Sequence, residues 1–442
     1  MEKSYKTALI MVSVVCITTI IALLSVSFYY LNAYGEYGRQ LENIYKKNLY
    51  ELVNNVNSVE VDISKIVATT SFTTQQKLLN SIYKSCGEIE SNLNNLPISE
   101  TKTKNVNKLY NTLSGYTYSL IRANDVLSEE NLDNLEEMHS KCLIVMYDLN
   151  NYLNEVSYGY SILNDIDFSN ENNSVFNGGF VESNMEDGDV PSLIYDGPFS
   201  DSVTNKEVKG LGSVEISQNQ AEDIVKDKFK GYSAKEINYI GNTEGKFATF
   251  NYELKCDGLI LYVQVTKLGG VVIAINGEAE SGNFDYTEEL TKELAQNFAI
   301  NLGYENMYPV WLQIDGNIAY VNLAPMVDGV IYYPDLVKVK VDISRAQVVG
   351  LDGTNYCYNH IEREVYDPEI SVERAKEHVG KKLTIEDTNL AIIPNEFVGE
   401  TYVYEFVCTW KDYKYFVYVD ANLGEMVDIL RVIKTTNGNL VI

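Results

Sequence analysis

The sequence is poor in the residues that most enzymes use for chemistry. Its 442 residues include 3 His, 6 Cys, 2 Trp and 8 Pro. The histidines, His139, His360 and His378, fall in different expected elements, and no H-E-x-x-H, G-x-S-x-G or Walker motif is present. A Ser or Cys nucleophile needs a base beside it, and with only three histidines such a pair is not expected. The 62 acidic residues leave a glycosidase-like carboxylate pair open, but we expect no enzyme, and no catalytic, cofactor-binding or metal-binding residues.

The cysteines are few and scattered. Cys16 lies in an apolar run near the N-terminus, and five remain beyond it: Cys86, Cys142, Cys256, Cys357 and Cys408. Their odd number, wide spacing and lack of a C-x-x-C motif exclude a disulfide framework and a zinc site. Cys86 and Cys142 fall at core positions of expected helices, so they are predicted to be buried thiols.

Basic residues are scarce in the C-terminal part of the chain. Residues 166–442 hold 22 basic and 44 acidic side chains, and the whole chain has a formal net charge of -27. Such a surface repels nucleic acid and anionic headgroups and favours a basic partner, or serves only solubility. The hydrophobic fraction of 45% and the few prolines argue against wholesale disorder. The length predicts two to four domains.

The N-terminus carries one long uncharged segment. Ala8–Leu31 is apolar and exceeds the roughly 20 residues that a helix needs to cross a bilayer core. Lys3 and Lys6 precede it, which favours an orientation with the N-terminus inside and the rest outside. A cleavable signal peptide is the alternative, because Ser25-Val26-Ser27 is a small-x-small site. Residues 1–35 are therefore expected to be a cytoplasmic tip and a transmembrane anchor.

Residues 36–163 show four stretches in which apolar residues recur at spacings of three and four. This pattern predicts an up-down-up-down four-helix bundle. The four stretches run from Tyr45 to Ile66, from Leu78 to Leu96, from Val106 to Leu127, and from Leu132 to Val156. His139 occupies one of these positions, which is compatible with a ligand or pH-switch role. Met138 could fill the position instead, so a structural or surface histidine is favoured.

Residues 164–210 are expected to form a linker, because they are rich in Asn, Asp, Glu, Ser and Gly and lack periodicity. Within them, Pro191–Asp201 reads PSLIYDGPFSD. This segment is either a docking peptide or a cap that folds over the next domain. The candidate partner-binding residues are Tyr195, Asp196, Gly197, Pro198 and Phe199.

The remainder contains one unit three times, at residues 211–282, 283–355 and 356–442. Each copy opens with a short amphipathic helix that has a Ser or Thr N-cap: Ser217, Thr287 or Ser371. Each ends in a hairpin, VQVTKLGGVVIAI, VKVDISRAQVVGL or VYVDANLGEMVDI. Gly270, Ala346 and Gly424 coincide in the three hairpins. Since Gly supplies the positive φ of a tight turn, Ala346 predicts a different second turn.

A helix followed by an antiparallel sheet that ends in V-x-V-D-x-x-x-G-x-V/I resembles the PepSY domain. The order of one membrane span, a helical region, the PSLIYDGPFSD segment and three such repeats resembles the YpeB family of spore germination proteins. The fold class is therefore expected to be multidomain, with an all-α bundle followed by three α+β repeats.

The resemblance implies a protein of the spore inner membrane, with most of the chain facing the cortex. It implies partner binding without chemistry of its own. The implied partner is the spore cortex-lytic enzyme SleB, which such a protein would stabilise and restrain until germination. Two alternatives stay open: an extracytoplasmic ligand sensor, and a protease-inhibiting PepSY protein.

Overall fold

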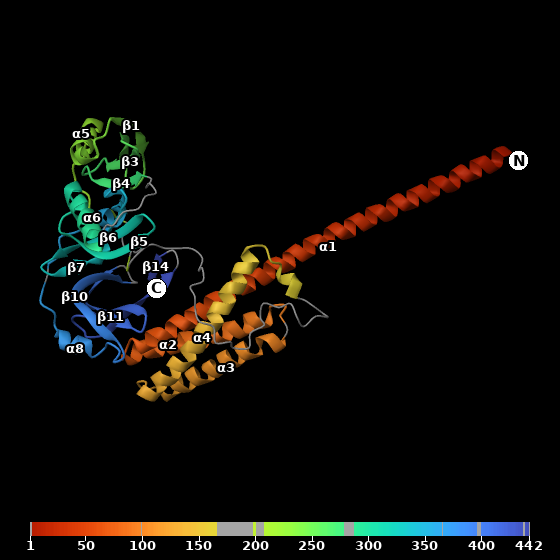
Figure 1. The fold of residues 1–442 in the computed structure, drawn as a ribbon, viewed down its shortest axis with the longest axis horizontal. Coiled ribbons are helices and arrows are strands. Elements are labelled where there is room, and N and C mark those ends of the chain that lie inside the picture. The colour runs from red at the N-terminus through yellow and green to blue at the C-terminus, as the bar shows by residue number, and fades with distance from the viewer. Residues whose placement is uncertain are drawn as a thin grey trace. The chain divides into compact units, whose positions relative to one another are not determined.

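The computed structural model describes residues 2–98, 100–165, 198–199, 207–277, 287–364, 366–395, 399–435 and 438–441. The chain divides into two compact units. The first comprises Met1–Ile63, Leu78–Asp125 and Glu129–Met185, and the second comprises Ser64–Lys77, Val126–Ser128 and Glu186–Ile442. The first unit is helical and the second combines helices with a sheet (Figure 1). An N-terminal helical region and a C-terminal mixed region are therefore both present, as the sequence predicts.

The helical region consists of α1 (Glu2–Val67), α2 (Phe72–Asn94), α3 (Glu100–Ala123) and α4 (Glu129–Ser157). Their buried side chains follow the spacing that the sequence predicts, because residues three and four apart share one helix face. Leu52, Ile82, Leu113 and Leu149, one from each helix, have no exposed surface. Not every position of the pattern is buried: Tyr116 and Met146 are half-buried, and Ala123 is exposed.

Helix α1 is one unbroken helix of 66 residues. It passes through the expected boundary between anchor and helical domain at residues 35 and 36. The described part from Ile17 onward contains a stretch of mean hydropathy 1.4, and none of that stretch is buried. Burial begins near Leu49. By length and composition, α1 is thus able to cross a membrane with its N-terminal half while its C-terminal half packs in the protein.

A polar pair lies inside the helical core. His139 of α4 and Glu60 of α1 are 2% and 1% exposed, and His139 Nε2 lies 2.6 Å from Glu60 Oε1. His139 rather than Met138 therefore fills the core position, and a buried polar group requires such a partner. Burial also raises the pKa of Cys142 to about 12. Cys86 and Cys142 are buried free thiols, as predicted, and a protonated thiol is a poor nucleophile.

The second unit contains three consecutive segments of helix and strands, here called the first, second and third α/β segments. The first has α5 (Gln218–Lys228), β1 (Glu236–Thr243), β2 (Thr249–Cys256), β3 (Leu259–Thr266) and β4 (Val272–Gly277). The second has α6 (Glu288–Leu302), β5 (Met307–Asp315), β6 (Ile318–Val327), β7 (Val330–Tyr332), β8 (Val337–Asp342), β9 (Gln347–Asp352) and α7 (Thr354–Asn359). The third has α8 (Val372–Lys376), β10 (Thr384–Asn395), β11 (Gly399–Trp410), β12 (Tyr413–Asp420), β13 (Met426–Thr435) and β14 (Gly438–Val441).

The strands of all three segments form one continuous sheet in the order β1-β2-β3-β4-β9-β8-β6-β7-β10-β11-β12-β13-β14, with β5 paired to β6. The first junction is antiparallel, where Ile275 of β4 pairs with Leu351 of β9. The second is parallel, where Ile331 of β7 pairs with Ala391 of β10. Backbone hydrogen bonds therefore run from segment to segment without interruption.

The three opening helices begin at the expected N-caps. The side chains of Ser217, Thr287 and Ser371 each accept a backbone N–H from the first turn. The third helix is shorter than expected, because α8 ends at Lys376 and not at Val379.

The prediction that the second hairpin turn differs is wrong. Ala346 adopts φ 53°, close to the values of 66° at Gly270 and 73° at Gly424. The turn is held by Asp342, whose Oδ1 accepts the N–H groups of Ser344 and Arg345 at 2.9 and 3.3 Å. These contacts hold Ala346 in a left-handed conformation that alanine rarely adopts by itself.

Two short N-terminal pieces belong to the second unit. Val67 and Ala68, at the end of α1, are buried in the same apolar cluster as Trp410, Tyr415 and Ile429. Gln75 of α2 donates to the carbonyl of Thr69 at 3.0 Å and accepts the N–H of Leu127 at 3.1 Å. Residues 64–77 and 126–128 are therefore tied to each other and to the third α/β segment.

Candidate functional site

Pro198 and Phe199 lie where the second and third α/β segments meet. Pro198 is buried and Phe199 is half-buried. The ring of Phe199 stacks edge-on against Tyr333, at 5.3 Å, and against Tyr418 of β12, at 5.2 Å between ring centroids. Edge-to-face aromatic pairs of this kind are favourable beyond their buried area. This part of the PSLIYDGPFSD segment therefore covers the chain's own surface, while Phe199 stays partly exposed.

A buried carboxyl group lies beneath these rings. Glu405 of β11 is 2% exposed, and the hydroxyl of Tyr333 donates to its Oε2 at 2.6 Å. The amide of Asn389 lies 3.3 Å from its Oε1. Burial raises the pKa of Glu405, against the opposing effect of Tyr333, Tyr418 and Asn389. The site thus contains an acid whose proton is harder to remove than that of an ordinary glutamate.

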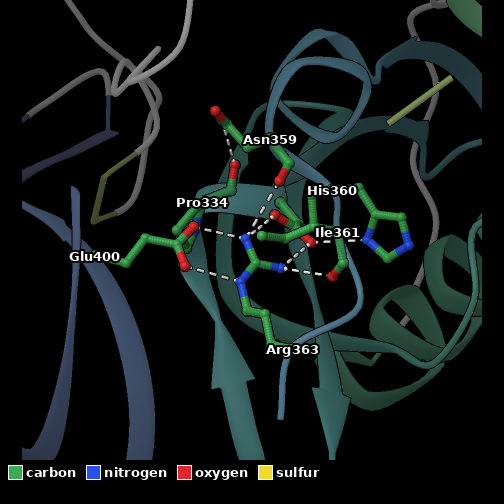
Figure 2. A network of polar contacts seen from close by, with 7 residues as sticks. Pro334, Asn359, His360, Ile361, Arg363 and Glu400 are labelled. Carbon is green, nitrogen blue, oxygen red and sulfur yellow. Dashed lines mark hydrogen bonds and ion pairs between the residues drawn. The ribbon is translucent and has the colours of Figure 1, made fainter. Parts of the chain in front are cut away.

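The same junction holds a second polar cluster, around Arg363 (Figure 2). Its side chain is 5% exposed, and its guanidinium binds two carboxylates, each through two oxygens. Asp335 accepts from Nη1 and Nη2 at 2.8 and 2.9 Å, and Glu400 accepts from Nε and Nη2 at 2.9 and 2.6 Å. The pKa of Arg363 is raised because the two carboxylates outweigh burial, which by itself would lower it.

Further contacts complete this cluster. The guanidinium donates to the backbone carbonyls of Ile361 and Asn359, and lies over the ring of Tyr332 at 5.1 Å. Asp335 has no exposed surface and also pairs with Nδ1 of His360 at 2.8 Å. Because Asp335 precedes β8 and Glu400 lies in β11, Arg363 links the second segment to the third.

The His360–Asp335 pair resembles two members of a hydrolase triad only in part. No Ser or Cys is hydrogen-bonded to His360 in the part of the chain that the structure describes. Asp335 is occupied by Arg363, and the His360 ring stacks on Tyr356 at 4.1 Å. Among those same residues, no cluster of three His, Cys, Asp or Glu side chains could hold a metal ion. The arrangement is suited to fixing a junction rather than to proton transfer.

Of the candidate residues, Tyr195, Asp196 and Gly197 lie outside the described residues, so their role stays a prediction. Pro198 and Phe199 do lie together, but Phe199 packs on Tyr333 and Tyr418 of the second and third segments and not over the next domain, the first segment. Sequence reasoning missed Arg363, Asp335, Glu400 and Glu405. Arg363 is separated from its carboxylate partners by 28 and 37 residues, so no local pattern marks the cluster.

Two family models match the chain. One, described as YpeB N-terminal, covers residues 34–161, and the other, described as YpeB sporulation, PepSY1 and PepSY2 domains, covers residues 176–366. Sporulation protein YpeB of Halalkalibacterium halodurans is 23% identical over 418 residues, which span 87% of this chain and 89% of the relative. The same-named protein of Oceanobacillus iheyensis is 21% identical over 418 residues, 92% of this chain and 94% of the relative.

The sporulation protein YpeB of Bacillus subtilis is 23% identical over 408 residues, 87% of this chain and 88% of the relative. Among solved structures, the Bacillus megaterium YpeB C-terminal domain aligns with a TM-score of 0.45 at 20% identity. It covers 49% of this chain and 98% of that chain.

Proposed function

Because the chain belongs to the YpeB family of sporulation proteins, we propose that it is a membrane-anchored, non-enzymatic partner of a spore cortex-lytic hydrolase of the SleB type. In this role it stabilises the hydrolase in the spore and restrains it until germination. The observation that carries the proposal is that the helical part and the α/β part both match one sporulation family, in a chain whose first helix is able to span a membrane.

The proposed architecture is a four-helix bundle followed by three PepSY-like repeats. The periodic burial on α1 to α4 supports the bundle. The three capped helices and the three matching hairpins support the repeats. The family description of PepSY1 and PepSY2 ends at residue 366, so the third repeat rests on its own N-cap at Ser371 and its turn at Gly424.

The proposed location is the spore inner membrane, with residues beyond the span facing the cortex. Support comes from the unburied apolar stretch of α1 and from Lys3 and Lys6 before it. The acidic excess of residues 166–442 favours a basic surface on the partner.

The proposed contact surface is the Tyr195–Phe199 segment, in which Phe199 rests on the buried rings of Tyr333 and Tyr418. Aromatic side chains contribute disproportionately to binding energy at protein interfaces. Phe199 is half-buried, so it is already positioned by its own chain and needs little ordering when a partner binds.

The test is capture of the partner with the full chain, solubilised in mild detergent from dormant spores. A cortex hydrolase should be recovered, and a protease in its place would support the inhibitor alternative. Tyr195→Ala combined with Phe199→Ala should weaken hydrolase binding about thirtyfold, the equivalent of about 2 kcal/mol. Tyr262→Ala, which removes an aromatic ring 46% exposed on β3, is the matched control.

Two results would overturn the proposal. One is cleavage of cortex peptidoglycan by the purified chain alone. The other is a normal content of hydrolase, and normal cortex breakdown, in spores that lack this protein.

A further inference from the structure

The third α/β segment carries an interaction surface that is filled by another part of the same chain. We propose that residues 64–77, the end of α1 and the start of α2, dock on this surface strongly enough to hold residues 207–442 without the connecting chain of residues 166–197. The occupant is thus the connection between α1 and α2 of this chain, with the helix ends on either side of it. The inference concerns the isolated protein and does not depend on the proposed function.

The first support is backbone pairing. Thr69 forms an antiparallel bridge with Val379, the N–H of Thr70 donates to the carbonyl of His378 at 3.1 Å, and the N–H of Gly380 donates to the carbonyl of Ala68 at 2.9 Å. The Thr70 hydroxyl donates to the carbonyl of Glu377 at 2.6 Å. The last carbonyls of a helix lack partners within it. Thr70 therefore supplies hydrogen-bond donors to the carbonyl groups of Glu377 and His378, which lie just after the end of α8.

The second support is close packing. Val67 and Ala68 are 1% and 0% exposed, within the apolar cluster of the third segment. A Cβ atom at Gly380 would lie 2.1 Å from the carbonyl oxygen of Val67. Only glycine permits this approach of the two backbones, so the surface is shaped for its occupant.

The third support is a buried cation. Arg431 of β13 is 2% exposed, lies over the ring of Tyr413 at 4.8 Å, and donates from Nη1 to the hydroxyl of Ser64 at 2.9 Å. Burying a guanidinium costs free energy that hydrogen bonds from its N–H groups help to offset. Without Ser64, the Nη1 group of Arg431 loses this hydrogen-bond acceptor.

These contacts have a direct physical consequence. Residues 64–77 include the end of α1 and the start of α2, so they stay on the N-terminal piece after a cut. The hydrogen bonds and apolar contacts described above join them to the third segment, which lies on the C-terminal piece. A cut anywhere in residues 166–197 should therefore leave two polypeptides in one complex.

The experiment uses the full chain in detergent with an N-terminal affinity tag and a protease recognition sequence inserted between residues 176 and 186. After cleavage, the C-terminal piece should stay on the affinity resin. Release of that piece after cleavage of the chain that carries only the tag and the protease site would overturn the proposal.

Two variants, one on each side, test the interface. Ala68→Asp places a carboxylate in the apolar cluster and should lower the retained fraction about tenfold or more after cleavage. Ala123→Asp, at an exposed alanine of α3, is its control and should retain the piece. Gly380→Val should also release it, whereas Gly231→Val, at a glycine with open space around it, should not.

A folding readout separates docking from misfolding. Both tryptophans, Trp311 and Trp410, belong to the second unit, so their fluorescence reports on it. In uncut Ala68→Asp, tryptophan fluorescence should still show cooperative unfolding of the second unit, because the sequence of the third segment is unchanged. Retention of the cleaved piece by Ala68→Asp, to the extent seen with Ala123→Asp, would overturn the proposal.

Discussion

At the scale of single residues, the junction of the second and third segments depends on Arg363. Replacing it by Met removes all its hydrogen bonds to Asp335 and Glu400, and leaves Asp335, which has no exposed surface, without its main counter-charge. Removing one partner of a buried ion pair commonly costs about 3–5 kcal/mol. Urea unfolding of the full chain, followed by tryptophan fluorescence, should show a loss of this size. Arg374→Met, at an exposed arginine of α8, should change little, and equal losses in both variants would contradict this account.

Glu405 makes the second unit sensitive to pH. Because burial raises its pKa above the unfolded value, the folded state holds a proton at pH values where the unfolded state has released it. Its contribution to stability is therefore full below the ordinary glutamate pKa, and is lost as the pH rises through the raised pKa.

Glu405→Gln removes this titration. Relative to the parent chain, the variant should gain stability as the pH increases across that window. Unfolding midpoints of both proteins, measured by tryptophan fluorescence at several pH values above 4, test the prediction. A difference in midpoint between the two proteins that does not change with pH would show that Glu405 has the same pKa in the folded and the unfolded state.

At the scale of elements, the helical core is the part most open to a simple test. Leu113 of α3 has no exposed surface, so Leu113→Asp buries an unpaired charge at a cost of several kcal/mol. Circular dichroism of the full chain should show earlier thermal loss of helix. Thr112→Asp, one residue away on the exposed side, is the control, and identical melting of the two variants would reject the assigned helix face.

The sequence predicted those elements that are specified locally. Apolar residues at spacings of three and four placed Leu52, Ile82 and Leu113 in the core, and Ser217 and Thr287 were recognised as N-caps because a cap acts within one helical turn. The conformation of Ala346 was missed, because Asp342 holds it against alanine's own preference. The end of α8 was misplaced because residues 68–70, about 300 positions earlier, bind just beyond it.

Longer-range features of the site were beyond sequence reasoning. Phe199 was singled out by its segment, but its neighbours Tyr333 and Tyr418 follow it by more than a hundred residues. The strands that pair with β4 and β10 could not be predicted either, because the sequence of a strand does not specify its partner strand.

At the scale of the whole molecule, α1 contains the stretch that is long and apolar enough to cross a membrane. With Ala8–Leu31 retained, the full chain should sediment with membranes, resist high salt and dissolve only in detergent, because about 20 apolar residues insert stably. A chain that starts at residue 36 should remain in the aqueous fraction. A mature N-terminus near Phe28 would show instead that the segment is cleaved.

The two unlike junctions in the continuous sheet bear on how such a protein can change in evolution. A solenoid lengthens by duplication because each new unit meets its neighbour through the same interface. Here β4 meets β9 antiparallel, whereas β7 meets β10 parallel, and neither contact can be reused by an inserted copy. The middle segment alone supplies both kinds of edge. Insertion of a segment between two others, or loss of the middle one, would therefore require a new kind of junction, so the number of segments should be far more constant among related chains than their sequences are.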